Sequence, residues 1–401
     1  MSERLFPNPV FLVLLVSLLS CNAEDQMVDS AEGVLKKVIP ENLERGQTIN
    51  QDVSELEFIP LRSGENVFLG EIKKMLIKED YLIILCYGRS SVYVFDRSGE
   101  FQFRIGSTGS GPLEFSSLQD VIVFGSYLMI SDNELGKVLQ YDLSQRSFTK
   151  EWLFEFAPFA MEMGKDYLYI LTNGSSDGFI KSAKNLDFSD LNTSIAAKPP
   201  FNLISSIQPF LLFQEQLFLN GSFSDTIYLA SHGVFQPFAV IGNMQTSVAN
   251  INSNVLIDAF FSRDPEASKQ IEHTFITAGY VSAVNEKWII RLQNPVGHFI
   301  IYDYQKEESV LVDENRYLDE IRLLTGVPYP SFKYQDEDGY VYMGFLPTEN
   351  WYEGIIELPT DHPIRSAAET GLGEYFGDPA FENPVLVKFK PGKAFMEVEG
   401  R

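Results

Sequence analysis

The fold is decided by residues 81–105, which read YLIILCYGRSSVYVFDRSGEFQFRI. Three apolar or alternating segments, 81–85, 92–95 and 101–105, have the length and the β-branched and aromatic content of strands. Between the last two segments lies Asp96-Arg97-Ser98-Gly99, in which glycine supplies the positive φ of a hairpin turn. The stretch therefore predicts an antiparallel β-meander.

The same pattern returns along the chain with a period of about 40 to 46 residues. Similar apolar segments begin at Tyr81, Tyr127, Tyr167, Gln216, Trp288 and Gly339. A repeat of this length with three or four short strands is typical of β-propeller blades, whereas a β-sandwich would not give the periodicity. The sequence therefore predicts an all-β fold, a six-bladed β-propeller.

Closure of such a ring needs a strand from the other end of the chain. Two segments have the right pattern, Glu55–Leu61 near the start and Pro384–Phe389 near the end. A single helix is expected between blades four and five, because Asp264-Pro265-Glu266 combines a capping residue with proline in the first turn. We expect this helical insertion to run to about Phe275.

The first residues predict export. Arg4 precedes an apolar run from Val10 to Leu19, and Leu18-Leu19-Ser20-Cys21 has the form of a lipobox. A membrane-spanning helix needs about 20 apolar residues, twice the length of this run. Residues 1–20 are thus predicted to be a lipoprotein signal peptide, with lipidation at Cys21. A cleaved signal without lipid is the alternative.

The remaining chain divides into two expected parts. Residues 22–50 are polar and without period, so 21–50 is predicted to be a flexible tether. Residues 51–401 are assigned to the propeller domain.

Charge and cysteine content exclude several classes of function. The net charge of −24 argues against binding to nucleic acid or to anionic lipid, both of which require basic surfaces. With Cys21 assigned to lipid, Cys86 has no cysteine partner and is expected to be a buried small apolar residue.

No motif predicts a cofactor or a metal. The glycine-rich residues 106–111 lack the lysine and the helix of a phosphate loop, so they are interpreted as a crossover between blades. Asp336-Glu337-Asp338-Gly339 lacks the later ligands of a calcium loop, and His273 and His362 each lack a second histidine at ligand spacing. Catalytic residues are not identified.

Propeller geometry indicates where a ligand would bind. The loops after the second strand of each blade fall on one face, together with the connections between blades. We call this the loop face. Its predicted loops contain aromatic, amide and cationic side chains suited to a sugar or a peptide: Tyr87, Arg89, Asn133, Asn173, Asn294, Trp351 and Tyr352.

Several short segments resemble a known family, the six-bladed β-propeller lipoproteins of Bacteroidota-type bacteria, which are similar to NHL-repeat propellers. The matching segments are Ile59-Pro60-Leu61, Val94-Phe95-Asp96 with Gly99, 106–115, 224–228 and 382–386. The resemblance implies the fold and an extracytoplasmic location, and it implies no reaction.

The resemblance also indicates a cellular location. Asn22-Ala23-Glu24-Asp25 is similar to the acidic signal that exports lipoproteins of such bacteria to the cell surface. We therefore expect an outer-membrane lipoprotein exposed at the cell surface, with a periplasm-facing protein as the alternative.

Three hypotheses of function follow. The first is a non-enzymatic module that binds a glycan, a peptide or an envelope protein at the loop face. The second is an extracytoplasmic lyase or hydrolase with acidic residues in the propeller channel. The third is a scaffold subunit of an envelope complex. A close pair of buried carboxylates with raised pKa in the channel would favour the enzyme.

Overall fold

The computed structural model describes most of the chain from Lys36 onward. The described residues are 36–42, 47–63, 68–87, 91–106, 108–172, 180–184, 187–194, 208–222, 224–242, 248, 251–314, 322–324, 332–378 and 381–399. The predicted signal peptide, Cys21, Arg89 and Asn173 lie outside them. In the described part, no helix is long and apolar enough to cross a membrane.

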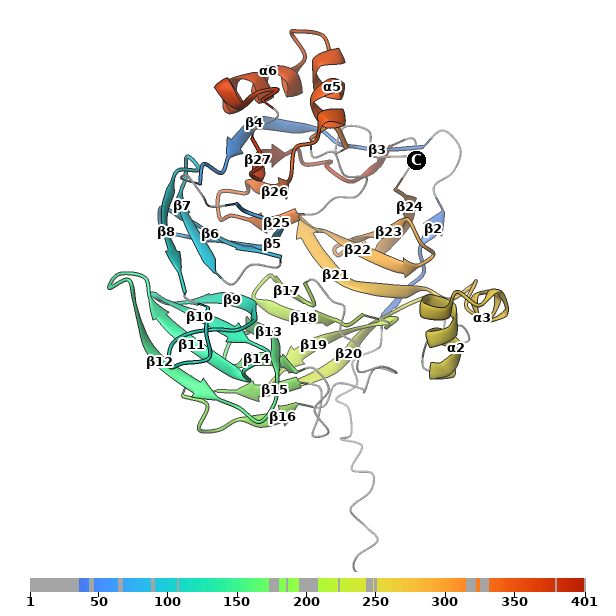
Figure 1. Cartoon of the computed structure of the whole chain (residues 1–401). Coiled ribbons are helices and arrows are strands. Elements are labelled where there is room, and N and C mark those ends of the chain that lie inside the picture. The colour runs from blue at the N-terminus through green and yellow to red at the C-terminus, as the bar shows by residue number, and fades with distance from the viewer. Residues whose placement is uncertain are drawn as a thin grey trace, which may run out of the picture. The chain divides into compact units, whose positions relative to one another are not determined.

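Six antiparallel sheets form the blades, and Figure 1 shows their first strands gathered around the centre of the ring. Blades one and two consist of β5 (Ile72–Lys78), β6 (Tyr81–Cys86), β7 (Val92–Asp96), β8 (Phe101–Ile105), β9 (Leu118–Phe124), β10 (Tyr127–Asp132), β11 (Lys137–Asp142) and β12 (Ser147–Leu153). Blades three and four consist of β13 (Pro158–Met163), β14 (Leu168–Thr172), β15 (Ile180–Ala183), β16 (Asn192–Ser194), β17 (Phe210–Phe213), β18 (Gln216–Asn220), β19 (Thr226–Ser231) and β20 (Val234–Ile241). Blades five and six consist of β21 (Ile276–Val284), β22 (Lys287–Asn294), β23 (His298–Asp303), β24 (Glu308–Asp313), β25 (Phe332–Gln335), β26 (Val341–Phe345), β27 (Val385–Pro391) and β4 (Val53–Pro60).

The predicted fold is confirmed, and the ring closes where the sequence indicated. β4 supplies the outer strand of blade six and pairs antiparallel with β27, with Phe58 opposite Val387. The two predicted closing segments therefore pair with each other. Their contact faces are buried, since Phe58 is 1% exposed and Val387 is fully buried.

The β7–β8 turn predicted at Asp96–Gly99 is also present. Asp96 Oδ1 accepts hydrogen bonds from the backbone N–H groups of Ser98 and Glu100, at 2.9 and 3.1 Å. Gly99 has a φ of 86°, and a Cβ atom there would lie 2.3 Å from the carbonyl oxygen of Pro60. Glycine is required both by the turn and by the close approach of the closing strand.

The predicted tether is wrong for its described residues. β1 (Lys36–Val38) adds in parallel to β20, and β2 (Glu41–Asn42) adds in parallel to β24. β3 (Thr48–Ile49) pairs with β28 (Val398–Glu399) near the C-terminus. The physical reason is that isolated apolar residues, such as Val38 at 1% exposure, are enough to dock a strand onto an existing sheet edge. The compact unit begins at Lys36.

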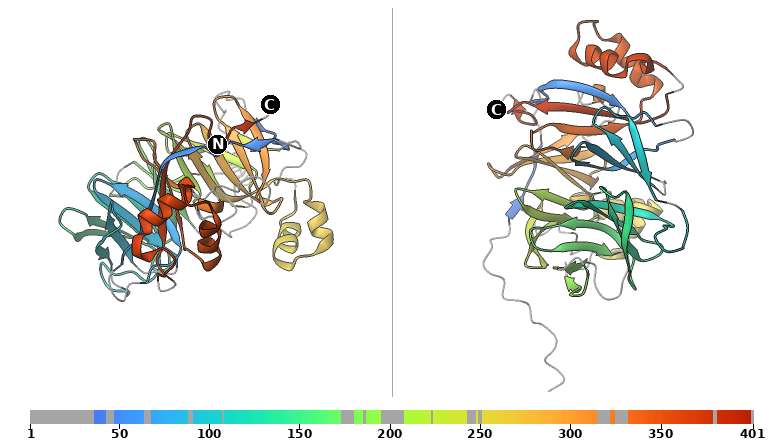
Figure 2. Two further views of the ribbon diagram at one scale, coloured as in Figure 1. Left: turned by 90° about the horizontal axis from the view of Figure 1, so that it is seen from above. Right: turned by 90° about the vertical axis from the view of Figure 1, so that its left-hand side faces the viewer.

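Most helical residues that the structure describes lie in two insertions, which Figure 2 shows on one side of the sheets. The first, predicted between blades four and five, contains α2 (Ser253–Ile257), the π-helical turn η3 (Asp258–Ser262) and α3 (Pro265–Gln270). As expected, Asp264 caps α3 by accepting the N–H of Ala267 at 2.8 Å, although α3 ends before Phe275. The second, between β26 and β27, contains α5 (Glu349–Glu357), α6 (Pro363–Leu372) and η4 (Gly373–Tyr375), and it was not predicted.

The hydrophobic core lies between neighbouring blades. One cluster joins blades four and five through Phe218 and Trp288, whose ring centroids are 4.6 Å apart. Another joins blades one and six through Cys86 and Tyr342. Cys86 is 2% exposed, as predicted for a small buried apolar residue. Because these cores are shared between blades, each blade depends on its neighbours.

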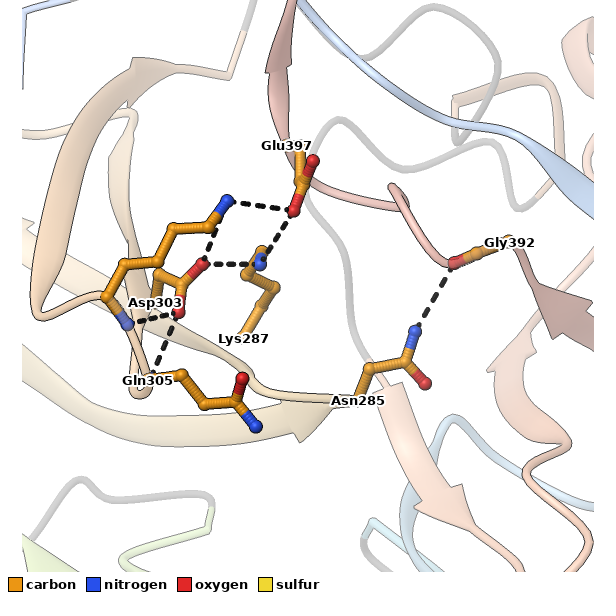
Figure 3. Close-up of polar contacts among 7 residues, drawn as sticks. Asn285, Lys287, Asp303, Gln305, Gly392 and Glu397 are labelled. Carbon is orange, nitrogen blue, oxygen red and sulfur yellow. Dashed lines mark hydrogen bonds and ion pairs between the residues drawn. The ribbon is translucent and has the colours of Figure 1, made fainter.

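A polar cluster fastens the C-terminal segment to blade five (Figure 3). Lys287 Nζ lies 2.6 Å from Asp303 Oδ2 and 3.4 Å from Glu397 Oε1, and Lys306 Nζ lies 3.1 Å from the same Glu397 oxygen. Nearby, Asn285 Nδ2 donates to the carbonyl oxygen of Gly392 at 3.3 Å. Burial raises the pKa of Asp303, but its hydrogen bonds from Lys287 and from the N–H of Lys306 outweigh burial and hold that pKa below its usual range. We call this cluster the latch.

We predict that Asp303→Asn lowers the free energy of unfolding by about 2 kcal/mol at pH 7, because it leaves the buried Lys287 with one weaker partner. The depressed pKa contributes stability above the ordinary pKa of about 4, and that stability is lost as the pH falls through the folded-state pKa. The difference between wild type and variant should therefore shrink between pH 5 and about pH 3. Urea denaturation across this range measures it.

Glu353→Gln, an exposed carboxylate on α5, is the matched control and should change stability by less than about 0.5 kcal/mol. Equal stability of Asp303→Asn and wild type at pH 7 would contradict a stabilising role for the latch.

Candidate functional site

A cavity on the propeller axis is the leading candidate site. Its volume is about 430 Å³, within the range of small-molecule pockets, and five of the six inner strands contribute to its wall. Lining residues include Lys74 and Met75 of β5, Glu162 of β13, Phe210 and Leu212 of β17, Ser282 of β21, and Lys333 and Tyr334 of β25. We call it the axial cavity.

Three strands bring a charged triad to one end of this cavity. Lys74 Nζ lies 3.1 Å from Asp120 Oδ1 and 3.6 Å from Glu162 Oε2. Asp120 also accepts the N–H of Met161 at 2.7 Å, so its carboxylate links blades one, two and three. Burial opposes the charged form of Lys74, but the two carboxylates outweigh burial and raise its pKa.

Glu162 is the least compensated carboxylate of the triad. Burial raises the pKa of Glu162, the charge of Lys74 lowers it, and the charge of Asp120 raises it again, with a net upward shift. A channel enzyme was expected to have a close pair of buried carboxylates with raised pKa. The raised pKa is found at Glu162, which therefore has the character of a proton donor.

Lys73 lies beside the triad. Its ammonium donates a short hydrogen bond to the carbonyl oxygen of Gln119. Its Nζ also lies 6.0 Å from the ring centroid of Tyr87 and 5.9 Å from that of Phe159, within cation–π distance. Burial lowers the pKa of Lys73, against the opposing charge of Asp120.

Lys333 has the least compensated ammonium group on the cavity wall. Its residue is only 8% exposed, and within the described ranges its Nζ has neither a hydrogen bond nor an ion pair. Burial lowers its pKa to about 8, although the charges of Glu71 and Cys86 oppose that shift. A lysine in this state costs stability in the absence of a ligand.

The predicted loop-face residues do not form one site. Tyr87 lies half-buried at the end of β6, next to Lys73, and so close to the channel. Asn133 is half-buried in blade two, and its Oδ1 has no partner among the residues that the structure describes. Asn294 donates to the carbonyl oxygens of Ile271 and Thr274, at 2.8 and 2.7 Å, and thereby holds the end of the first helical insertion.

Trp351 and Tyr352 belong to a helix instead of the expected loop. Both are buried in α5, at 5% and 9% exposure. Trp351 Nε1 donates to the carbonyl oxygen of Leu323 at 2.8 Å, and its ring lies 4.9 Å from that of Phe345. Their side chains pack the core between α5 and blade six, which leaves little surface for a ligand.

The sequence contained a signal for the residues that were missed. Lys73, Lys74, Asp120, Glu162 and Lys333 are charged residues within or beside apolar strands. In a propeller, a charge on the first strand of a blade points toward the axis or lies beside it, instead of facing outer solvent. To use this signal, one must first know which strand of each blade is the innermost.

No group of three or more histidine, cysteine, aspartate or glutamate side chains that could hold a metal occurs among the described residues. The groups that the axial cavity offers to a ligand include lysines, carboxylates and apolar side chains.

The sheet order and the axial cavity define a β-propeller of six blades. Residues 38–390 match the model of a family described as "Domain of unknown function (DUF4934)", and the chain belongs to this family. No curated protein matches the sequence.

Two Bacteroides proteins are among the solved structures that resemble the chain. A "Putative exported protein" from Bacteroides fragilis is 16% identical with a TM-score of 0.63, over 89% of this chain and all of that one. A member of the DUF4221 family from Bacteroides vulgatus is 12% identical with a TM-score of 0.48, over 86% of this chain and 99% of that one. At these identities, the first likeness supports the fold alone.

We predict that Lys333→Met raises the free energy of unfolding by about 2 kcal/mol at pH 7, because it removes a buried ammonium group without a partner. The folded-state pKa lies below the unfolded value, so the unfolded chain binds more protons between pH 8 and about 10.5. Wild-type stability should rise relative to the variant across this window, and the difference should vanish above it. Urea denaturation between pH 7 and 10.5 provides the measurement.

Lys393→Met removes an exposed lysine and serves as the control, with little expected change at any of these pH values. A Lys333→Met protein less stable than wild type at pH 7 would show that Lys333 has a compensating partner.

Proposed function

We propose that this protein is an extracytoplasmic β-propeller, anchored to the outer membrane through lipid on Cys21, which binds a small ligand in its axial cavity. The observation that carries the proposal is a cavity of about 430 Å³ lined by inner strands of five blades. A pocket that large with a few buried polar groups is typical of ligand sites.

The expected address is supported by the signal peptide and lipobox of the sequence, with Glu24 and Asp25 favouring the cell surface. A likeness to a protein described as exported is in keeping with it. The classes of ligand expected from the sequence were a glycan, a peptide or an envelope protein. Of these, a monosaccharide-sized or dipeptide-sized molecule suits the volume of the cavity.

One observation favours a second function. Glu162 has a raised pKa and lies with Asp120 on the same lysine, which is the arrangement required of a general acid in a channel hydrolase or lyase. Ligand binding and catalysis would use the same cavity. They differ in whether the bound molecule is converted to a product.

The first experiment is a ligand screen on the full chain carrying Cys21→Ala, with monosaccharides, hexuronic acids, short-chain carboxylates and dipeptides. We expect at least one compound to raise the melting temperature and to bind in calorimetry. Leu212→Trp should reduce that affinity at least tenfold, because Leu212 is 54% exposed on the cavity wall and an indole would fill the space.

Leu153→Trp is the matched control, because Leu153 is 72% exposed on the outer strand β12, and it should leave binding unchanged. Binding that survives Leu212→Trp, or a screen without any hit, would contradict the proposed site. Conversion of the ligand to a product, abolished by Glu162→Gln, would favour the enzyme over the binding module.

The second experiment concerns the anchor. Cys21→Ala should move the protein from the membrane fraction to the soluble fraction of cells, because the lipid is its expected attachment. Protease treatment of intact cells should degrade the wild-type protein if it is exposed at the surface. An unchanged membrane fraction in the variant would contradict the lipid anchor, and full protection would favour the periplasm-facing alternative.

A further inference from the structure

The three lysines of the channel are compensated to different degrees. Lys74 has two carboxylates within 4 Å. Lys73 has the carbonyl oxygen of Gln119 and two aromatic rings. Lys333 has neither a hydrogen bond nor an ion pair within the described ranges, although it is 92% buried. The cavity wall therefore carries one ammonium group whose counter-ion the described protein does not supply.

The lack of a counter-ion is notable in so acidic a chain. The chain has 55 carboxylate residues and a net charge of −24. Of its other buried lysines, Lys287 pairs with Asp303 at 2.6 Å and Lys137 with Glu151 at 3.3 Å. Lys181 donates to the hydroxyl of Thr193 at 2.8 Å. The charges that influence Lys333 are those of Glu71, which is exposed, and of Cys86. A buried cation left in this way favours an incoming anion, because the anion restores the interactions that burial removed.

Apolar side chains form part of the cavity wall beside the polar ones. Leu212 is 54% exposed although it lies on an inner strand, so its side chain is presented to the cavity. Phe210 and Met75 line the same cavity, and Tyr334 follows Lys333 directly on β25. Such a surface gains free energy when a hydrocarbon or ring displaces water from it.

We propose that the axial cavity binds a small organic monocarboxylate, with its carboxylate on Lys333 Nζ and its apolar body against Leu212 and Tyr334. The proposal rests on the proposed function and specifies its ligand class. A monocarboxylate matches one uncompensated ammonium group, and the volume of about 430 Å³ accommodates a body of six to eight carbons.

The charge of Lys333 gives this ligand class a pH signature. Other titratable groups that line the cavity are Lys74, Glu162, Tyr334 and Asp336, and Glu71 and Cys86 lie near Lys333 itself. Lys74 and its carboxylates compensate one another, and Asp336 accepts hydrogen bonds from the N–H of Tyr340 at 2.8 Å and the hydroxyl of Tyr342 at 3.3 Å. The ammonium of Lys333 is therefore the cavity charge left for an anion. Its pKa of about 8 means that affinity should be greatest below pH 8 and should decline above it.

The test compares hexanoate with hexanol and hexylammonium by calorimetry on the full chain carrying Cys21→Ala. At pH 7 we expect hexanoate to bind at least tenfold more tightly than hexanol, and hexylammonium to bind least. Lys333→Met should abolish the preference for hexanoate over hexanol, while Lys393→Met should leave it intact. Because Lys333→Met is expected to stabilise the fold, loss of binding would not reflect unfolding.

A second pair of probes, glucuronate and glucose, tests the body of the ligand. Glucuronate bound more tightly than hexanoate, in a manner that depends on Lys333, would uphold the carboxylate and overturn the apolar body. Equal affinities of hexanoate and hexanol, or a preference that survives Lys333→Met, would overturn the proposal. If a neutral compound binds the wild-type protein but not the Leu212→Trp variant, the proposed function would still hold. If no compound binds, both the proposed function and the monocarboxylate proposal would be contradicted.

Discussion

The pairing of β4 with β27 is the constraint on which the remaining structure depends. The cores lie between blades, so a blade at an open end would leave one apolar face exposed to water. The N-terminal strand completes the sheet of blade six and joins the ends of the repeat. The N-terminal strands extend this arrangement. β1 (36–38) adds to blade four, β2 (41–42) adds to blade five, and β3 (48–49) pairs with the C-terminal strand β28.

Closure also creates the axial cavity. The first strands of the blades face one another around the centre of the ring (Figure 1). Residues far apart in the sequence, such as Lys74, Glu162 and Lys333, therefore line one space. The outer strand β4 closes the ring, whereas side chains of the inner strands line the cavity and can contact a ligand.

This division explains what could be predicted from the sequence. Repeated strands at Tyr81, Tyr127 and Tyr167 identified the blades, because strand pattern and turn chemistry are local properties. The cavity lysines were missed because their proximity depends on ring closure, which is not local. Trp351 and Tyr352 were misplaced for a related reason, since the α5–α6 insertion replaces a loop and buries both rings against blade six.

Two buried lysines of this fold, Lys287 and Lys333, differ in whether the described protein supplies a carboxylate partner. Both are at least nine-tenths buried, at 8% exposure each. Lys287 is matched by Asp303 and Glu397, and the resulting latch holds the C-terminal segment in place. The fold supplies carboxylate partners to a buried lysine in blade five, but the residues that the structure describes supply none to Lys333 in the channel. An unmatched buried cation whose removal should stabilise the protein is typical of a functional site, where stability is given up for ligand binding.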